Sequence, residues 1–193
     1  MPWEKSFDES EFLETVMQIF WEKGYAATSI SDITEATGIK RGSLYNAFDG
    51  KDDLFLQAIL KYDNEKRQRL IQEIELIESP REAVSAFFDK LVKSSLADKD
   101  KKGCLLVNTS LEYEKHDDAV KKVIDDGFRK LATFFEKTVK AGQVAHEIPR
   151  SVDAKAAAKA LVACLVGIRV LGRGTYGKTA LQQIANQAMQ LIS

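Results

Sequence analysis

Side chains that can hydrogen-bond or carry charge are concentrated in a short stretch around residues 40–51. Within it, Arg41, Ser43, Tyr45 and Asn46 offer a guanidinium, a hydroxyl, a phenol and an amide on one side of a predicted helix over 41–48. Apolar residues occupy the other side. Such groups can bind phosphates or base edges, and an α-helix fits a DNA major groove about 12 Å wide. The pattern predicts a DNA-contacting helix, and its alternative is a plain helical hairpin with a solvated polar face.

A preceding helix is needed to position this one, and its start and end signals are clear. Ser29 and Asp32 have the spacing of a capping box, in which each side chain satisfies a free backbone N–H of the other residue. Gly38 can adopt the positive φ that a sharp turn between helices requires. The sequence therefore predicts a helix over 29–37, a glycine turn, and the polar helix after it.

The segment FLETVMQIFWEKGYAATSISDITEATG, continued by IKRGSLYNAFDGKDDLF, resembles the N-terminal domain of the TetR family of bacterial transcriptional repressors. The resemblance implies a homodimer in which residues 1–50 form a helix-turn-helix DNA-binding domain. Residues 51–193 would form a helical domain that binds a small-molecule inducer and pairs the subunits. The positions that would contact the double-stranded DNA operator are Thr28, Ser29, Lys40, Arg41, Ser43, Tyr45, Asn46 and Lys51.

Two departures from the family pattern affect the DNA-contacting helix. The family usually starts it with a Ser or Thr cap followed by Lys, whereas Lys40 and Arg41 stand here. Losing the cap weakens the helix start by about 1 kcal/mol, while the added cation strengthens phosphate contact. After the tyrosine the pair is Asn46 and Ala47. The amide can make a bidentate contact to adenine, whereas alanine offers only a methyl group.

The charge of the N-terminal region is unusual for a DNA-binding domain. Residues 1–50 contain four cations and nine anions, a net charge of −5. Because non-specific affinity depends on basic groups at phosphates, binding would rest on Lys40, Arg41 and Lys51. The anions are crowded in a predicted helix over about 8–23, which can face away from DNA.

The whole chain indicates an all-α fold with one small head and one larger body. It has 193 residues, 45% of them hydrophobic, and only three prolines. No apolar run reaches the roughly 18 to 20 residues that span a bilayer, and the N-terminus lacks a signal-peptide pattern. A soluble cytoplasmic protein is therefore expected. We also expect no metal or cofactor, since the cysteines and histidines lack metal-ligand spacing; these are Cys104, Cys164, His116 and His146. A helical enzyme or small-molecule carrier is the alternative of another class, although no catalytic motif supports it.

A long helix over about 51–78 should connect head and body, with a charged middle from Asp63 to Arg69 that we expect to be solvated. Pro80 suits the first position of the next helix, with Ser79 as its cap. Another helix is predicted from about 118 to 140, ended by Gly142.

The segment GCLLVNTSLE resembles a pattern of one branch of the same family, where it lines or borders the inducer pocket. If a helix starts at Gly103, Cys104 lies in its first turn near Lys101 and Lys102. The helix dipole and the two lysines then favour the thiolate form of Cys104. A thiol that senses electrophiles or oxidants is one interpretation, and a small packing residue is the other.

The remaining inducer-site candidates also have two interpretations. Asn108 and Glu112 could fix a polar inducer or hydrogen-bond one another, and the phenylalanines could enclose a pocket or form an ordinary core. The candidate inducer-site residues are Phe87, Cys104, Asn108, Glu112 and Phe128.

Two amphipathic helices, over 154–171 and from about 179, end the chain. Small residues on the first would let another helix approach closely, and the resembling family dimerises at this place. Burial within one subunit is the alternative. The candidate dimer-interface residues are Ala160, Cys164, Gly167, Leu171, Leu181, Ile184 and Ala188.

Overall fold

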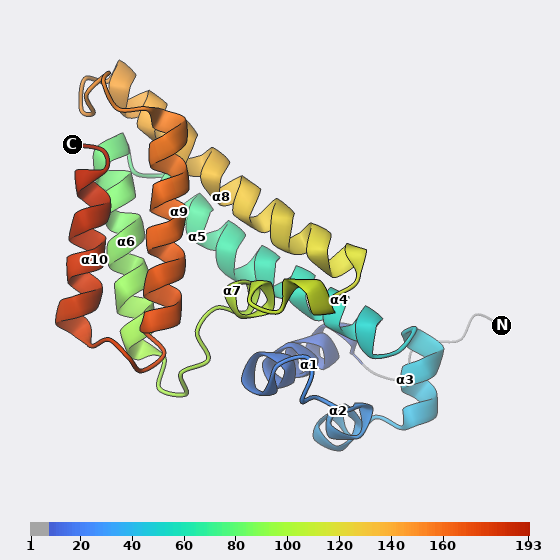
Figure 1. Ribbon diagram of the computed structural model, residues 1–193. Coiled ribbons are helices and arrows are strands. Elements are labelled where there is room, and N and C mark those ends of the chain that lie inside the picture. Colours follow the sequence, from blue (N-terminus) through green and yellow to red (C-terminus); the bar gives the residue numbers. More distant parts are fainter. Residues whose placement is uncertain (1–7) are drawn as a thin grey trace.

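The computed structural model describes residues 8–193, which form helices and connecting loops without a strand (Figure 1). Residues 1–7 lie outside the described range. The N-terminal segment that lacks a signal-peptide pattern begins with these residues. The all-α prediction is confirmed. The α-helices are α1 (Glu9–Lys23), α2 (Ile30–Thr37), α3 (Arg41–Ala47), α4 (Lys51–Tyr62), α5 (Arg69–Glu75), α6 (Pro80–Ala97), α7 (Leu105–Ser110), α8 (Asp118–Val144), α9 (Ala154–Leu171) and α10 (Lys178–Gln190). A π-helix, η1 (Asp63–Gln68), joins α4 to α5, and a 3-10 turn, η2 (Tyr113–Lys115), precedes α8.

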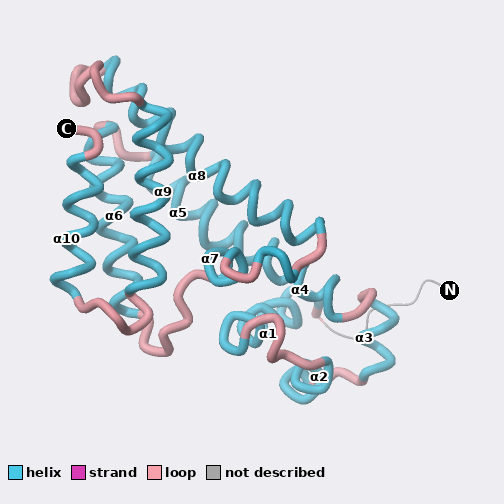
Figure 2. Tube along the Cα trace, viewed as in Figure 1, coloured by secondary structure: helices cyan, strands magenta, loops and turns pink. Residues whose placement is uncertain are grey.

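The helices divide into a head and a body that are bridged by the α4–η1–α5 segment. Helices α1, α2 and α3 lie together at one end, while α6, α9 and α10 stand side by side at the other (Figures 1 and 2). Helix α4 packs on α1, and α8 packs on α9 and α6. The bridging segment therefore touches the head at its start and the body at its end.

Helix starts in the body follow the sequence signals closely. The Ser79 hydroxyl accepts a hydrogen bond from the Glu82 N–H at 3.2 Å, and Pro80 occupies the first position of α6. Glu147, from the loop between α8 and α9, accepts hydrogen bonds from the Ser79 hydroxyl and the Arg81 N–H at 2.7 and 3.0 Å. These bonds fix the start of α6 against that loop and lower the pKa of Glu147, since they favour its ionised form.

The charged middle of the bridging segment is solvated only in part. Asn64, Lys66 and Arg69 are exposed as expected. Asp63 and Arg67 are only 7% and 9% exposed, and they form a two-pronged ion pair in which Arg67 Nη2 lies 2.7 Å from Asp63 Oδ2. Both charges can be buried because each neutralises the other one turn away. The expectation was wrong for this pair because a charged stretch was treated as one exposed face.

Gly142 does not end α8, which continues to Val144. A Cβ at Gly142 would lie 2.6 Å from Ile148 Cδ1. The glycine thus provides room for the Ile148 side chain, which folds back from the following loop onto the helix. The predicted stop was wrong because glycine here serves close packing and not chain reversal.

Two hydrophobic cores hold the fold. The body core lies between α6, α8, α9 and α10 around an aromatic group in which the Phe87 and Phe135 ring centroids are 4.9 Å apart. The head core surrounds Phe20 and Phe55, whose rings meet edge to face at 4.9 Å, and continues into α7 and the start of α8. The head is therefore packed against the body and does not hang from a free linker.

Candidate nucleic-acid interface and ligand cavities

The turn between α2 and α3 has the predicted geometry. Ser29 Oγ accepts from the Asp32 N–H at 3.1 Å, while Asp32 accepts from the Ser29 N–H at 2.7 Å, which confirms the capping box. Gly38 ends α2 with φ +68°. Lys23 of α1 pairs with Asp32 at 2.6 Å, and this pairing, together with the bonds from Ser29, holds the pKa of Asp32 below its usual value. Local signals alone thus fix the start and end of α2.

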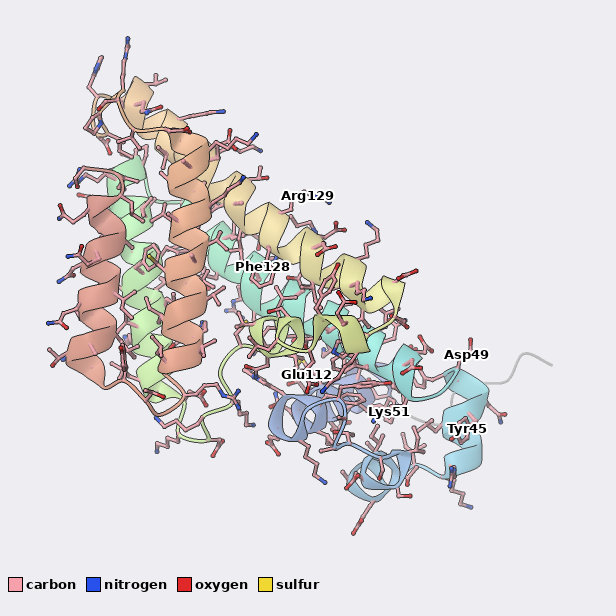
Figure 3. All side chains as sticks on the ribbon, viewed as in Figure 1. Tyr45, Asp49, Lys51, Glu112, Phe128 and Arg129 are labelled. Carbon is pink, nitrogen blue, oxygen red and sulfur yellow. The ribbon has the colours of Figure 1, made fainter. Side chains whose placement is uncertain are left out.

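Helix α3 presents the polar face that the sequence predicted. Leu44 is fully buried beneath it, while Arg41, Tyr45 and Asn46 are exposed and Ser43 is half-buried. Tyr45 is labelled in Figure 3. The Arg41 guanidinium lies 5.6 Å from the Tyr45 ring centroid, so the cation and the phenol form one unit. Their contact with DNA stays a prediction.

Lys40 precedes α3 and makes no side-chain cap hydrogen bond, as the departure from the family pattern predicted. Lys40 and Arg41 are both exposed. Two cations therefore lie at the helix start, beside backbone N–H groups that no side chain caps. This arrangement suits a phosphate.

Lys51, at the start of α4, is positioned by Tyr25. Its Nζ lies 4.3 Å from the Tyr25 ring centroid, and the Tyr25 hydroxyl donates to Asp52. Partial burial and Asp52 raise the pKa of Tyr25 to about 12. Tyr25 thus orients Lys51 at the edge of the head. Nothing in the spacing of residues 25 and 51 signals this contact.

Thr28 does not present a DNA-contacting group. It is 2% exposed, and its hydroxyl donates to the Gly24 carbonyl at 2.8 Å. That bond steadies the turn between α1 and α2, so the predicted contact by the Thr28 side chain is wrong. The neighbouring Ser29 is exposed, but its hydroxyl belongs to the capping box.

Part of the negative charge of α1 is directed at the body. Glu22 lies 2.6 Å from Lys102 Nζ, and Glu14 lies 3.6 Å from Lys61 Nζ. Body lysines therefore neutralise two of the carboxylates in this acidic head. This pairing reduces the repulsion that the head would exert on a phosphate backbone.

The five candidate inducer-site residues do not share one site. Phe87, Cys104 and Phe128 line a cavity of about 70 Å³, called here the body cavity, together with Tyr62, Leu91 and Arg169 among others. Asn108 and Glu112 line a different space of about 470 Å³ between head and body, called here the junction cavity. The four-residue spacing predicts that Cys104, Asn108 and Glu112 share one helix face, but α7 ends at Ser110, before Glu112.

Asn108 and Glu112 also have other partners than one another. The Asn108 amide donates to the Lys102 carbonyl at 2.7 Å and accepts from Arg173 at 3.3 Å, whereas Glu112 pairs with Lys115 at 2.9 Å. Both side chains therefore brace the loops around the junction cavity.

Cys104 is the residue before α7 and does not lie in its first turn, because the helix begins at Leu105. The thiol is half-buried and borders the body cavity beside Tyr62. Burial, with the neighbouring Cys104, raises the pKa of Tyr62 well above its usual value, so the phenol stays protonated. Arg169, also on the wall, donates to Ser95 Oγ at 3.2 Å. The body cavity is thus largely apolar with a polar end.

The C-terminal helices leave an apolar face half-covered. Ala160, Cys164, Gly167 and Leu171 on α9, and Ile184 on α10, are half-buried. Leu181 and Ala188 are fully buried within the subunit, where α10 packs on α6 and α9. Their prediction as direct partner contacts is wrong, because they occupy the inner face of α10.

Taken together, a capped glycine-turn helix pair with an exposed polar helix, attached to an all-helical body with an internal cavity, defines a helix-turn-helix transcriptional regulator. Residues 12–58 match the family described as bacterial regulatory proteins, tetR family, and residues 80–189 match the tetracyclin repressor-like C-terminal domain. The chain belongs to the tetR family of bacterial transcriptional regulators and carries its DNA-binding domain.

Relatives match over nearly the whole chain. YezE, an uncharacterized HTH-type transcriptional regulator of Bacillus subtilis, is 25% identical over 97% of this chain and 97% of its own length. ComR, an HTH-type transcriptional repressor of Escherichia coli, is 25% identical over 97% of this chain and 90% of its own. A cysteine mutant of the regulator CifR, solved with 26-bp operator DNA, is 25% identical with a TM-score of 0.83, covering 96% of this chain and 97% of its own.

Between residues 8 and 193, no helix combines the length and the apolar character needed to cross a membrane. The same residues contain no group of three or more His, Cys, Asp or Glu side chains arranged to hold a metal ion.

Proposed function

We propose that the protein is a homodimeric repressor in the bacterial cytoplasm that occupies a palindromic operator and leaves it when a small molecule fills the body cavity. The exposed face of α3, held on the rigid glycine turn, is the observation that carries the proposal. Residues 1–50 would bind DNA, and residues 51–193 would bind the inducer and the second subunit.

The DNA contacts divide by chemistry. Lys40, Arg41 and Lys51 are cations at the starts of α3 and α4, so they suit phosphates, with Tyr45 beside them. Ser43 and Asn46 are uncharged and lie along α3, which suits them to base edges. Since the head is acidic overall, these few cations would supply most of the electrostatic attraction.

The apolar face of α9 and α10 supports pairing of two subunits. Its half-buried residues are small or branched, and α9 and α10 together can form a four-helix interface with the same pair of a second copy. Two recognition helices must lie about 34–36 Å apart to enter successive major grooves. The dimer would set that spacing.

The body cavity is placed to change this spacing. It is walled by Tyr62 of α4 and Arg67 of η1, and the helix that ends at Tyr62 begins at Lys51 in the head. At about 70 Å³ the cavity must widen to admit a drug-sized molecule, since such pockets usually measure about 300–1,000 Å³. A ligand that widens it would displace α4 and thus the head, and it would favour a state with weaker DNA binding.

A gel shift tests the proposal. The protein is titrated at a fixed salt concentration against the DNA upstream of its own gene, with excess random DNA as competitor. A saturable complex that survives the competitor, and that is lost in an Arg41→Ala variant but kept in Lys93→Ala, is expected. Lys93 is an exposed lysine of α6 and serves as the matched control. Equal competition by random DNA would overturn the proposal.

A second candidate is a thiol-based regulator that senses an electrophile or oxidant through Cys104. The supporting observation is that the Cys104 thiol borders the body cavity, where a reagent that enters would meet it. An electrophile such as N-ethylmaleimide should then release DNA from the native protein and from Cys164→Ser, but not from Cys104→Ser. Release from Cys104→Ser would show that the thiol only packs.

A further inference from the structure

We propose that the junction cavity is a second ligand site, separate from the body cavity, for a neutral planar aromatic compound that carries a hydroxyl group.

The junction cavity has the size and walls of a ligand site. Its volume of about 470 Å³ lies within the usual range of roughly 300–1,000 Å³ for small-molecule sites. The side chains of Phe20, Trp21, Tyr25 and Phe55 contribute aromatic walls. Planar rings pack well against such walls in offset or edge-to-face contact. The cavity therefore favours an aromatic ligand over a flexible chain.

His116 supplies an unused hydrogen-bonding group at this cavity. The residue is 6% exposed, and its ring stacks on Phe55 and meets Tyr25 edge to face, with centroids 5.3 and 5.1 Å away. It lines the junction cavity and also a neighbouring hollow beside Asp52 and Asp117, and no hydrogen bond of its imidazole is described within residues 8–193. The buried side-chain nitrogen without a partner in this part of the chain is Trp21 Nε1, so the His116 nitrogens are open to solvent or to a bound hydroxyl group.

The protonation state of His116 narrows the ligand chemistry. Burial lowers the pKa of His116, although Glu112, Asp117 and Asp52 act in the opposite direction. The ring is therefore neutral near pH 7 and has one donor and one acceptor nitrogen. A hydroxyl group can both donate and accept, so it can pair with either nitrogen.

The charged residues of the cavity are already paired, which argues for a neutral ligand. Glu22 pairs with Lys102 at 2.6 Å, Lys23 pairs with Asp32 at 2.6 Å, and Glu112 pairs with Lys115 at 2.9 Å. Two acidic and two basic side chains line the cavity, the fourth being Arg173, whose Nε donates to the Lys101 carbonyl at 2.8 Å. Arg173 has neutral partners, and the formal charges of the two acidic and two basic side chains cancel, so a neutral ligand leaves the charge balance of the cavity undisturbed.

Trp21 gives the site a spectroscopic reporter. It lines the cavity, and its buried indole Nε1 has no hydrogen-bond partner among the described residues. The chain contains two tryptophans, so a Trp3→Phe variant leaves a single indole signal. A ligand that fills the junction cavity must change the surroundings of that indole.

The test uses 2-naphthol as the probe and naphthalene as the matched compound without a hydroxyl. Each is titrated into the DNA-free full-length Trp3→Phe protein while the Trp21 indole peak is followed in a proton–nitrogen correlation spectrum. We expect 2-naphthol to shift the peak saturably. The loss of one hydrogen bond on changing to naphthalene should weaken binding roughly threefold to tenfold.

Three further variants, each in the Trp3→Phe background, locate the probe. Changing His116→Phe keeps the ring stack and should remove the preference for 2-naphthol, while Ala26→Phe, at an exposed position on the cavity rim, should block both compounds. Leu91→Phe narrows the body cavity without adding an indole and should leave binding unchanged. The proposal is overturned if the peak does not move, if His116→Phe keeps the same preference, or if only Leu91→Phe blocks the probe. Because no DNA is present, these outcomes are independent of the proposed repression.

Discussion

The α3 face of the head and the bridging segment of the body are both rich in charge, yet the two regions use charge in opposite ways. On α3, Arg41 is exposed and its only charged or polar contact described is with Tyr45. In the bridging segment, Arg67 is buried and paired with Asp63. An exposed cation is available to a partner and contributes little to stability, whereas a buried pair must stay intact for the fold to survive. In this molecule the charge available to a partner and the charges that the fold needs therefore belong to different residues.

The largest effect is expected from removing one member of the buried pair. Changing Asp63→Leu leaves the Arg67 charge buried and unpaired, which should reduce the free energy of unfolding by about 3–5 kcal/mol. Chemical denaturation at one protein concentration measures this, since a dimer's stability depends on concentration. The double variant Asp63→Leu with Arg67→Met is the control and should recover most of the loss. If the single variant were as stable as the native protein, the pair would not be buried in solution.

A smaller loss of stability is expected at the glycine turn. A Gly38→Ala substitution places a side chain at φ +68°, which costs about 1–2 kcal/mol. Gly42 lies inside α3 with a free space around its Cβ position, so Gly42→Ala should stabilise by about 0.5–1 kcal/mol. Thermal unfolding of the two variants separates backbone strain from added bulk. Equal effects from both would argue against a left-handed turn at residue 38.

The third prediction distinguishes recognition of the DNA base sequence by the exposed face of α3 from electrostatic attraction to phosphates. Replacing Asn46→Ala should leave stability unchanged and reduce discrimination at one base pair by about 1–3 kcal/mol. Arg41→Ala, by contrast, should weaken binding to all sequences and lower the salt dependence by about one counterion. Competition binding against single-base operator variants measures both. A uniform loss of affinity in Asn46→Ala would assign that amide to phosphate contact.

The smallest expected effect is a pH dependence at the head–body contact. Burial lowers the pKa of His116 in the folded protein below its ordinary value of 6.5. The unfolded chain then binds the proton more readily, so stability is full above pH 6.5 and declines as the pH falls from there through the folded pKa. Melting temperature measured across this range should show a decline that is reduced in His116→Phe. An unchanged decline in that variant would attribute it to other groups.

Much of the head could be predicted from its sequence because its signals are local. Ser29, Asp32 and Gly38 act on backbone groups within three or four residues, so their roles follow from spacing. The exposed order of residues on α3 follows from helical periodicity in the same way. The contact of Tyr25 with Lys51 joins residues 26 positions apart, and no local pattern reports it.

The sequence by itself determined the helix class, the caps at Ser29 and Ser79, and the polar face of α3, since each depends on neighbouring residues along one helix. Tertiary structure alone decided which charges are buried. It also separated the candidate inducer-site residues between two cavities and turned Leu181 and Ala188 inward. These outcomes depend on which surfaces meet, because burial and pairing are set by the neighbours that packing brings together across the chain.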